Sequence, residues 1–258
     1  MKNRTDQLLL FTLALLIIYY IYFVRNNGTI AEQPQPIVPV KDTTSQTLTA
    51  NWKDAAFPLI FDAAFKQGTV LAQGEKRLTF SVLPLGNLQV ETGKIICCDD
   101  VNSFNALPFS QIFPTGNFPV ELSMIHGYAS DLVAFARVVF KTDTVVKWSY
   151  ALMPGQADKP ITDEDIYCYG VDAGTALFID SAANTKLSSL SEDEWKSIFL
   201  IRSLEYLNSG FIHSFHNYNM AVFTTGGGDG CYATYIGYNK LNEPCILLTD
   251  FAFVEWWK

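Results

Sequence analysis

Positive charge is scarce in this chain. Its 18 Lys and Arg residues are outnumbered by 26 Asp and Glu residues, so the formal net charge is −8 and the pI is about 4.8. A surface of that sign repels the phosphate backbone of nucleic acids, and no cluster of Lys and Arg offsets it locally. The sequence therefore predicts that the protein has no nucleic-acid partner.

Common catalytic and metal-binding motifs are also absent from the sequence. There is no Gly-x-Ser-x-Gly run of a serine hydrolase, no His-Arg-Asp run of a kinase, and no Gly-Lys-Ser/Thr run of a nucleotide-binding loop. The five cysteines include no Cys-x-x-Cys pair, and their odd number settles neither their pairing nor the compartment. We therefore predict no metal and no cofactor, and we leave open whether the protein is an enzyme.

The chain has only 3 histidines. His213 and His216 are three residues apart, a spacing that would place two metal ligands on one face of a helix. They follow Gly210, however, where the preceding helix is expected to end. We expect both to lie in a loop or at a strand edge, and we expect His126 to be isolated beside a strand.

One long apolar run is present near the start of the chain, from Leu8 to Val24. At ~1.5 Å per residue it spans roughly 25 Å, enough to cross a thin hydrocarbon layer. No convincing cleavage site follows it, which favours an uncleaved anchor over a cleaved signal. Lys2 and Arg4 precede it, which favours a domain on the extracytoplasmic, periplasmic side. The sequence thus predicts a single-pass membrane protein whose anchor, residues 1–25, contacts the bilayer.

The rest of the chain divides into a linker and one domain. Residues 26–50 are rich in Pro and Thr, which is typical of a semi-stiff spacer, and residues 51–258 are expected to form a single domain. A short helix is predicted between Trp52 and Lys66. A long helix is predicted over about 191–208, where Ser191 and Glu194 form a capping box.

Strands are expected elsewhere in the domain, because short apolar runs there are separated by Gly, Pro and Asn. The predicted strands are Leu78–Leu85, Leu88–Glu91, Lys94–Cys98, Val120–Ile125, Leu132–Lys141, Val145–Met153, Met220–Thr225, Cys231–Tyr238 and Cys245–Phe253. The last three are expected to be consecutive antiparallel strands. The sequence therefore predicts an α+β fold, a mostly antiparallel sheet with one long and one shorter helix, preceded by a single transmembrane helix.

The loop Gly226-Gly-Gly-Asp-Gly230 is the most prominent candidate site. Its backbone N–H groups could form an anion-binding concavity, or Asp229 could bind a ligand or a metal ion. Alternatively, the glycines only turn a hairpin and Asp229 bonds to its own backbone. Cys231 follows the loop, but a cysteine in a strand is usually inert, so we do not expect it to be a nucleophile.

Four aspartates lie in the two most distinctive segments of the chain. A pair of them within ~5–10 Å could perform acid/base chemistry or hold a divalent cation. Alternatively, each stabilises a turn or a strand end. The candidate ligand-binding residues are Asp172, Gly174, Asp180, Gly228, Asp229, Gly230, Tyr232 and Asp250.

Several local patterns, taken in order, resemble a bacterial family known only as domain-of-unknown-function family 4241. The segments that carry this resemblance are Gly93-Lys-Ile-Ile-Cys-Cys-Asp99, Pro114-Thr-Gly-Asn-Phe-Pro-Val120, Arg137 with Trp148, Val171-Asp-Ala-Gly174 with Phe178-Ile-Asp180, and Gly228-Asp-Gly-Cys-Tyr232 with Thr249-Asp-Phe251. The resemblance runs from about Asp54 to Phe251 and implies one domain without an established activity or established catalytic residues.

Two functions remain open from the sequence. The first is a membrane-anchored module that binds a small ligand or a protein partner, as accessory or immunity-like domains do. Trp256 and Trp257 support this function, because they are expected to leave an exposed aromatic patch of the kind that marks partner surfaces. The second is a hydrolase that uses Asp172 and Asp229 around a cation or a water molecule. We expect the positions of these two carboxylates to discriminate between the two functions.

Overall fold

Strands dominate the chain. A computed structural model describes residues 47–48, 57–99, 103–128, 130–161, 165–191, 193–194 and 209–257. Strands make up 48% of these residues and helices 8%. Within these described residues the prediction of an α+β fold with a long helix is wrong, because this part of the chain is a mostly β structure with two short α-helices.

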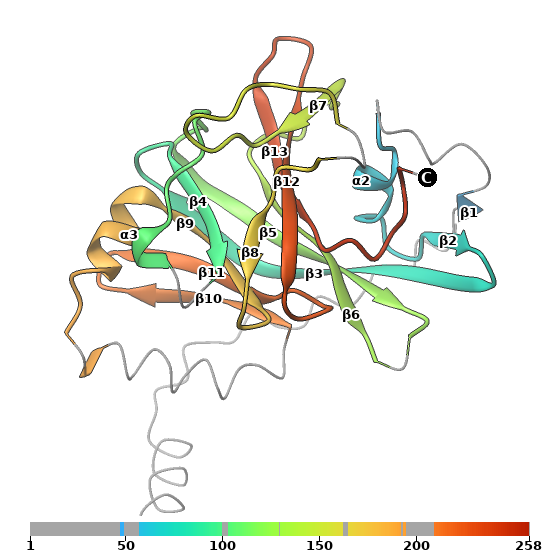
Figure 1. The fold of residues 1–258 in the computed structure, drawn as a ribbon, viewed down its shortest axis with the longest axis horizontal. Helices are drawn as coiled ribbons and strands as arrows, with labels where there is room; N and C mark the ends of the chain where they lie inside the picture. Colours follow the sequence, from blue (N-terminus) through green and yellow to red (C-terminus); the bar gives the residue numbers. More distant parts are fainter. Residues whose placement is uncertain are drawn as a thin grey trace, which may run out of the picture. The chain divides into compact units, whose positions relative to one another are not determined.

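The larger sheet has nine strands in the order β1-β2-β3-β5-β6-β13-β12-β7, and β8 pairs with the free end of β12. All pairs are antiparallel except β1 with β2 (Figure 1). The strands are β1 (Thr47–Leu48), β2 (Val70–Gln73), β3 (Lys76–Val90), β5 (Gly116–His126), β6 (Leu132–Val139), β7 (Lys147–Tyr150), β8 (Tyr169–Val171), β12 (Gly230–Tyr238) and β13 (Pro244–Asp250). We call this the large sheet.

A second, antiparallel sheet has four strands in the order β10-β11-β9-β4, and we call it the small sheet. Its strands are β4 (Ile95–Asp99), β9 (Thr175–Asp180), β10 (Gly210–Phe215) and β11 (Tyr218–Thr224). Every residue of β4 and β9 is buried. Both faces of these two strands are therefore covered, which explains why their sequences are almost continuously apolar.

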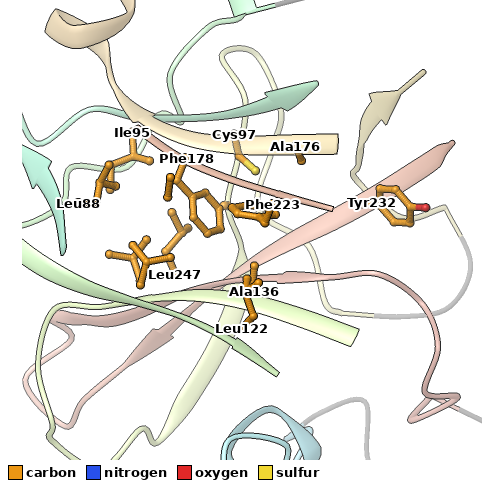
Figure 2. Close-up of a cluster of buried hydrophobic side chains, with 14 of the residues drawn as sticks. Leu88, Ile95, Cys97, Leu122, Ala136, Ala176, Phe178, Phe223, Tyr232 and Leu247 are labelled. Carbon is orange, nitrogen blue, oxygen red and sulfur yellow. The ribbon is translucent and has the colours of Figure 1, made fainter. Parts of the chain in front are cut away.

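The two sheets pack face to face around one apolar core. Figure 2 shows Cys97, Phe178 and Phe223 of the small sheet facing Ala136 and Leu247 of the large sheet. Side chains alternate between the faces of a strand, so the neighbours of these residues point away from this core. Those neighbours in the small sheet pack instead against helix α3 (Ser181–Leu187).

The opposite face of the large sheet is covered by helix α2 (Ile60–Ala63) and by the C-terminal segment after β13. Phe61 of α2 contacts the rings of Trp148, Tyr235 and Trp256, with centroids 4.9–5.0 Å apart. These buried aromatics anchor both segments on the sheet. The described chain is thus layered as helix and tail, large sheet, small sheet, helix.

The predicted transmembrane helix is corrected by the structure. A helix that crosses a bilayer needs about 20 apolar residues, whereas α3, the longer of the two α-helices given above, has 7 residues. Within the ranges given above, no helix is long and apolar enough to span a membrane. Residues 1–25, where we expected the anchor, lie outside those ranges. The membrane contact and the single-pass location inferred from that helix are therefore not retained.

The structure describes only part of each helix predicted in the domain. Of the segment 191–208, only residues 191 and 193–194 are described. The capping box is present there, since the backbone N–H of Ser191 donates to Oε2 of Glu194 at 2.9 Å and the N–H of Glu194 donates to the hydroxyl of Ser191 at 3.4 Å. The shorter helix is confirmed only as the single turn α2, and residues 52–56 lie outside the described part.

Most predicted strands exist, with shifted ends. The two segments expected at 78–85 and 88–91 form one strand, β3, with an irregularity between Pro84 and Gly86. Strands β1, β2, β8, β9 and β10 were not predicted. The expectation of three consecutive antiparallel strands at the C-terminal end is wrong for the first of them, because β11 pairs with β9 and β10 in the small sheet rather than with β12. The division of the chain at residue 51 stays a prediction.

Candidate functional site

Strand β12 brings most of the predicted site residues together. Its residue Gly230 is paired with Val171 of β8, directly before the loop that contains Asp172 and Gly174. Three residues further on, Ala233 is paired with Asp250 of β13. The two segments singled out in the sequence therefore meet along the first half of β12.

Asp180 is the exception among the candidates. It lies at the end of β9, where its Oδ1 accepts the N–H of Ala182 at 2.9 Å and so caps α3. Its Oδ2 accepts the N–H and the hydroxyl of Thr92 at 3.0 and 2.8 Å. This buried carboxylate caps a helix and holds a turn, as expected if Asp180 has a structural role rather than a ligand-binding one.

The loop of Asp172 is held by a residue that we had not considered as functional. Asp99, buried at the end of β4, accepts the N–H groups of Asp172 and Ala173 through Oδ2, at 2.6 and 3.0 Å. Gly174 follows with φ of +65°, a conformation that favours glycine. The buried carboxylate thus shapes the loop, while the side chain of Asp172 points to solvent.

The glycine loop is largely held by its own contacts. A Cβ on Gly226 would lie within 2.6 Å of the ring of Phe253, so only glycine fits there. The carbonyl of Gly228 accepts the hydroxyl of Tyr232 at 2.8 Å and also that of Thr225. Gly227 donates its N–H to the carbonyl of Thr225 at 2.6 Å. These bonds turn part of the backbone inward, which favours the structural alternative over an anion-binding concavity.

The two loops touch each other through their backbones. A Cβ built on Gly174 would lie 3.5 Å from Cα of Gly228, and the N–H of Thr225 donates to the carbonyl of Gly174 at 3.1 Å. Asp172 and Asp229 are both exposed to solvent at this junction. Water therefore solvates both carboxylates, and neither lies in the desolvated environment that tunes a catalytic carboxyl pair.

Asp250 is buried like Asp180, with 4% of the residue exposed, but unlike Asp180 it lies beside a pocket. Its Oδ2 accepts the indole N–H of Trp256 at 2.7 Å, and its Oδ1 accepts the N–H of Ala252 at 2.8 Å. Burial raises the pKa of Asp250 to about 7, although the hydrogen bonds from Trp256 and Ala252 act in the opposite direction. The carboxyl group therefore changes its ionisation state near neutral pH.

A pocket of about 150 Å³ opens beside this carboxyl group, and we call it the Asp250 pocket. Its remaining lining residues are Ile166, Cys231, Ala233, Tyr235, Ala252, Trp256 and Trp257. Tyr235 lies on the same face of β12 as Ala233, whereas Tyr232 lies on the opposite face, in the core between the sheets. Of the residues predicted for the site, Asp250 alone lines this pocket.

The aromatic residues of the C-terminal segment form a wall of the Asp250 pocket rather than an exposed patch. Trp256 is 1% exposed, and Trp257 is half-buried with its ring centroid 5.5 Å from that of Trp256. The expectation of a free aromatic surface at this end of the domain is therefore wrong for Trp256. The indole N–H of Trp256 is engaged by Asp250, which explains how so large a polar ring is buried.

The structure shows a disulfide bond at the site that the sequence did not predict. Cys231 forms a disulfide with Cys168, and this bond ties the segment before β8 to β12. Cys231 is therefore no free nucleophile. No local spacing signals this pair, since the two residues are 63 positions apart.

The histidines are placed partly as expected. His213 lies in edge strand β10, and His216, with φ of +51°, lies in the turn that follows, 3.4 Å from Glu194. His126 is not isolated, because its two ring nitrogens contact Ser81 and Asp131. In the described part of the chain no group of three or more His, Cys, Asp or Glu residues is arranged to hold a metal ion.

Comparisons with known proteins give one match. A search of curated proteins and a search of solved structures each returned no match. The model of the family described as "Protein of unknown function (DUF4241)" matches residues 88–249, which is more than half of the chain. The matched range contains β4, β9, β12 and all of β13 except Asp250, and so includes Asp99 and both loops that meet at Gly174 and Gly228. The chain therefore belongs to the DUF4241 family.

Proposed function

We propose that the protein is a ligand-binding module whose Asp250 pocket accepts a small organic cation, such as a primary or quaternary amine. The observation that carries this proposal is a buried carboxyl group facing a pocket with aromatic walls. Cations bind favourably over the faces of Trp and Tyr, and a desolvated carboxylate supplies the opposite charge. No lining residue is basic, so no internal cation competes for Asp250.

The charge of the whole chain supports the same ligand class. A net charge of −8 attracts cations to the surface and raises their rate of encounter with the pocket. The pocket volume of about 150 Å³ suits a ligand of a few heavy atoms rather than a protein side chain with its backbone. Together with the burial of Trp256, this favours a small ligand over a protein partner.

Hydrolysis by paired aspartates has weaker support. Asp172 and Asp229 are both exposed, and Asp250 lines the pocket without a second carboxylate among the lining residues. A lone carboxyl group can bind a cation, but it cannot provide the acid and the base that paired carboxylates share.

The proposal is tested with n-butylammonium and with 1-butanol as its uncharged analogue, measured by calorimetry and by tryptophan fluorescence. We expect saturable binding of the amine at pH 8 and much weaker binding of the alcohol. Because the cation needs an ionised carboxylate and the pKa of Asp250 is about 7, affinity should be about tenfold weaker at pH 6 than at pH 8.

Matched variants identify the site. Asp250→Asn should weaken amine binding by about tenfold or more, since a 1.4 kcal/mol loss already has that effect. Asp229→Asn removes an exposed carboxylate nearby and should bind as the wild type does. Trp257→Ala removes one aromatic wall without touching the hydrogen bonds of Asp250, and it should also weaken binding. Equal affinity for amine and alcohol, or undiminished binding by Asp250→Asn, would overturn the proposal.

A further inference from the structure

A second hollow lies on the other face of the large sheet, where the small sheet ends. Residues of β3, β5 and edge strand β10 line a cleft of about 790 Å³, which we call the β3–β5 cleft. Its apolar lining includes Leu83, Leu85, Met124, Phe211 and Ile212. Its polar lining includes Ser81, His126 and Asp131.

These three polar residues form a chain of two hydrogen bonds. The Oγ of Ser81 lies 2.7 Å from Nε2 of His126, and Nδ1 of the same ring lies 2.6 Å from Oδ1 of Asp131. A carboxylate only accepts hydrogen bonds, so Nδ1 of the neutral ring must carry the proton. Nε2 is then an acceptor, and the Ser81 hydroxyl must donate to it. This is the arrangement in which a histidine acts as a general base toward a serine.

Strand register, rather than local sequence, creates this arrangement. Thr79 is paired with His126 and Ser81 with Met124, so Ser81 is the diagonal neighbour of His126 on the same face. Asp131 directly precedes β6, which pairs with β5 and so brings the carboxylate beside the ring. Leu83 and Met124, on the same face, continue the surface as an apolar floor.

We propose that Ser81, His126 and Asp131 form a nucleophilic site that hydrolyses small carboxylic esters with an apolar acyl group. The Oγ of Ser81 attacks the ester carbonyl carbon while its proton passes to Nε2 of His126. The bond from that carbon to the alkoxy oxygen breaks, and the alcohol leaves with the proton from His126. Water, activated by the same nitrogen, then cleaves the acyl-serine, which releases the carboxylic acid and restores the Ser81 hydroxyl.

The residues have distinct roles in this proposal. Ser81 and His126 are the catalytic residues, because they touch the reacting atoms. Asp131 is a positioning residue that holds the ring and its proton at Nδ1. The side chain of Asp131 is 64% exposed and that of His126 39% exposed. Solvent screens such a pair, so we expect Asp131 to contribute about tenfold to the reaction, less than a buried carboxylate would.

The site is independent of the Asp250 pocket, and only His126 and Asp131 of its three residues lie in the family-matched range. Ser81 precedes the matched range of residues 88–249, so the proposal concerns this chain and not its family. The apolar walls of the cleft suit a short acyl chain, whereas the Asp250 pocket suits a cation. Failure of one proposal leaves the other unaffected.

The experiment uses the full chain with an alkyl fluorophosphonate, which phosphonylates an activated serine, and with p-nitrophenyl butyrate as an ester substrate. Mass spectrometry of the labelled protein should place the adduct on Ser81, and ester cleavage should show an acyl-enzyme at the same residue. The label should be absent from Ser81→Ala and at least tenfold slower in His126→Gln. Ser214→Ala changes an exposed serine of β10 outside the cleft lining and should label at the wild-type rate.

Asp131 is tested separately from folding. Asp131→Asn should slow labelling by about tenfold without a change in melting temperature, and Asp131→Glu should restore part of the rate. An unlabelled Ser81 in the folded wild type, or an adduct formed equally fast in His126→Gln, would overturn the proposal. The wild-type result decides it even if a variant fails to fold.

Discussion

At the scale of single residues, Asp250 is held where its charge is disfavoured. The hydrogen bonds from Trp256 and Ala252 stabilise the ionised carboxylate, yet burial outweighs them and the pKa rises to about 7. In the unfolded chain an aspartate has a pKa of about 3.9. At pH values between these two pKa values, Asp250 holds a proton in the folded state that it has released in the unfolded state.

This difference predicts how stability depends on pH. In the window from about pH 4 to 7 the folded state binds more protons, so raising the pH lowers the free energy of unfolding, and the effect ends above the folded pKa. Relative to Asp250→Asn, the wild type should lose about 2–3 kcal/mol between pH 5 and 7.5. Urea unfolding at both pH values measures this loss. A constant difference would contradict the raised pKa, and Asp229→Asn controls for net charge.

Other aspartates illustrate a different use of the same side chain. Asp99 and Asp180 are buried, and each accepts backbone N–H groups from a neighbouring loop. Sequence alone drew attention to Asp180 as a candidate ligand and passed over Asp99. In the structure both carboxylates hold a neighbouring loop in place, because backbone N–H groups at a turn need an acceptor and a carboxylate offers several lone pairs.

At the scale of elements, a disulfide bond holds the short strand β8 in place. This strand has only three residues, and it pairs with β12 at the edge of the larger sheet. The disulfide between Cys168 and Cys231 closes a span of 63 residues and restricts the unfolded chain. In the chain-entropy view a loop of this length gives about 4 kcal/mol of stabilisation.

The double variant Cys168→Ser/Cys231→Ser should therefore lower the free energy of unfolding by about 4 kcal/mol, measured in urea. Reduction of the wild type with dithiothreitol should produce a similar loss. The double variant itself should not respond to the reductant, which provides the internal control. Unchanged stability in both experiments would show that the bond does not form in solution.

At the scale of the whole molecule, the two sheets share one core. Phe178 lies near its centre, with its ring centroid 4.9 Å from that of Phe223 and no exposed surface (Figure 2). Large side chains in such a position cannot be removed without a cavity, because the surrounding sheets cannot collapse into the space. The sheets should therefore unfold together.

We expect Phe178→Ala to lower the free energy of unfolding by about 3–5 kcal/mol. Hydrogen exchange should show reduced protection in β6 and in β11 alike, since each sheet loses its partner's support. Leu241→Ala, at a residue that is 78% exposed, should change stability by less than about 0.5 kcal/mol. Loss of protection in only one sheet would show that the sheets unfold as separate units.

The sequence by itself determined where most strands lie and which family the chain belongs to. Short apolar runs such as 120–125 and 132–141 lie between turn residues, and that signal is local. The capping box at Ser191 and Glu194 is local as well, and it is formed as predicted. The order of short motifs between residues 88 and 249 was sufficient to indicate the family.

Only the tertiary structure decided what those residues do. The assignment of β11 to the small sheet, the disulfide of Cys168 with Cys231, and the meeting of Ser81 with His126 all join residues distant in the chain. A one-residue shift in the register of β3 on β5 would turn Ser81 to the opposite face. Burial of Asp250 likewise depends on how the C-terminal segment folds back over the sheet. Such contacts are set by the packing of the whole core, which no local pattern encodes.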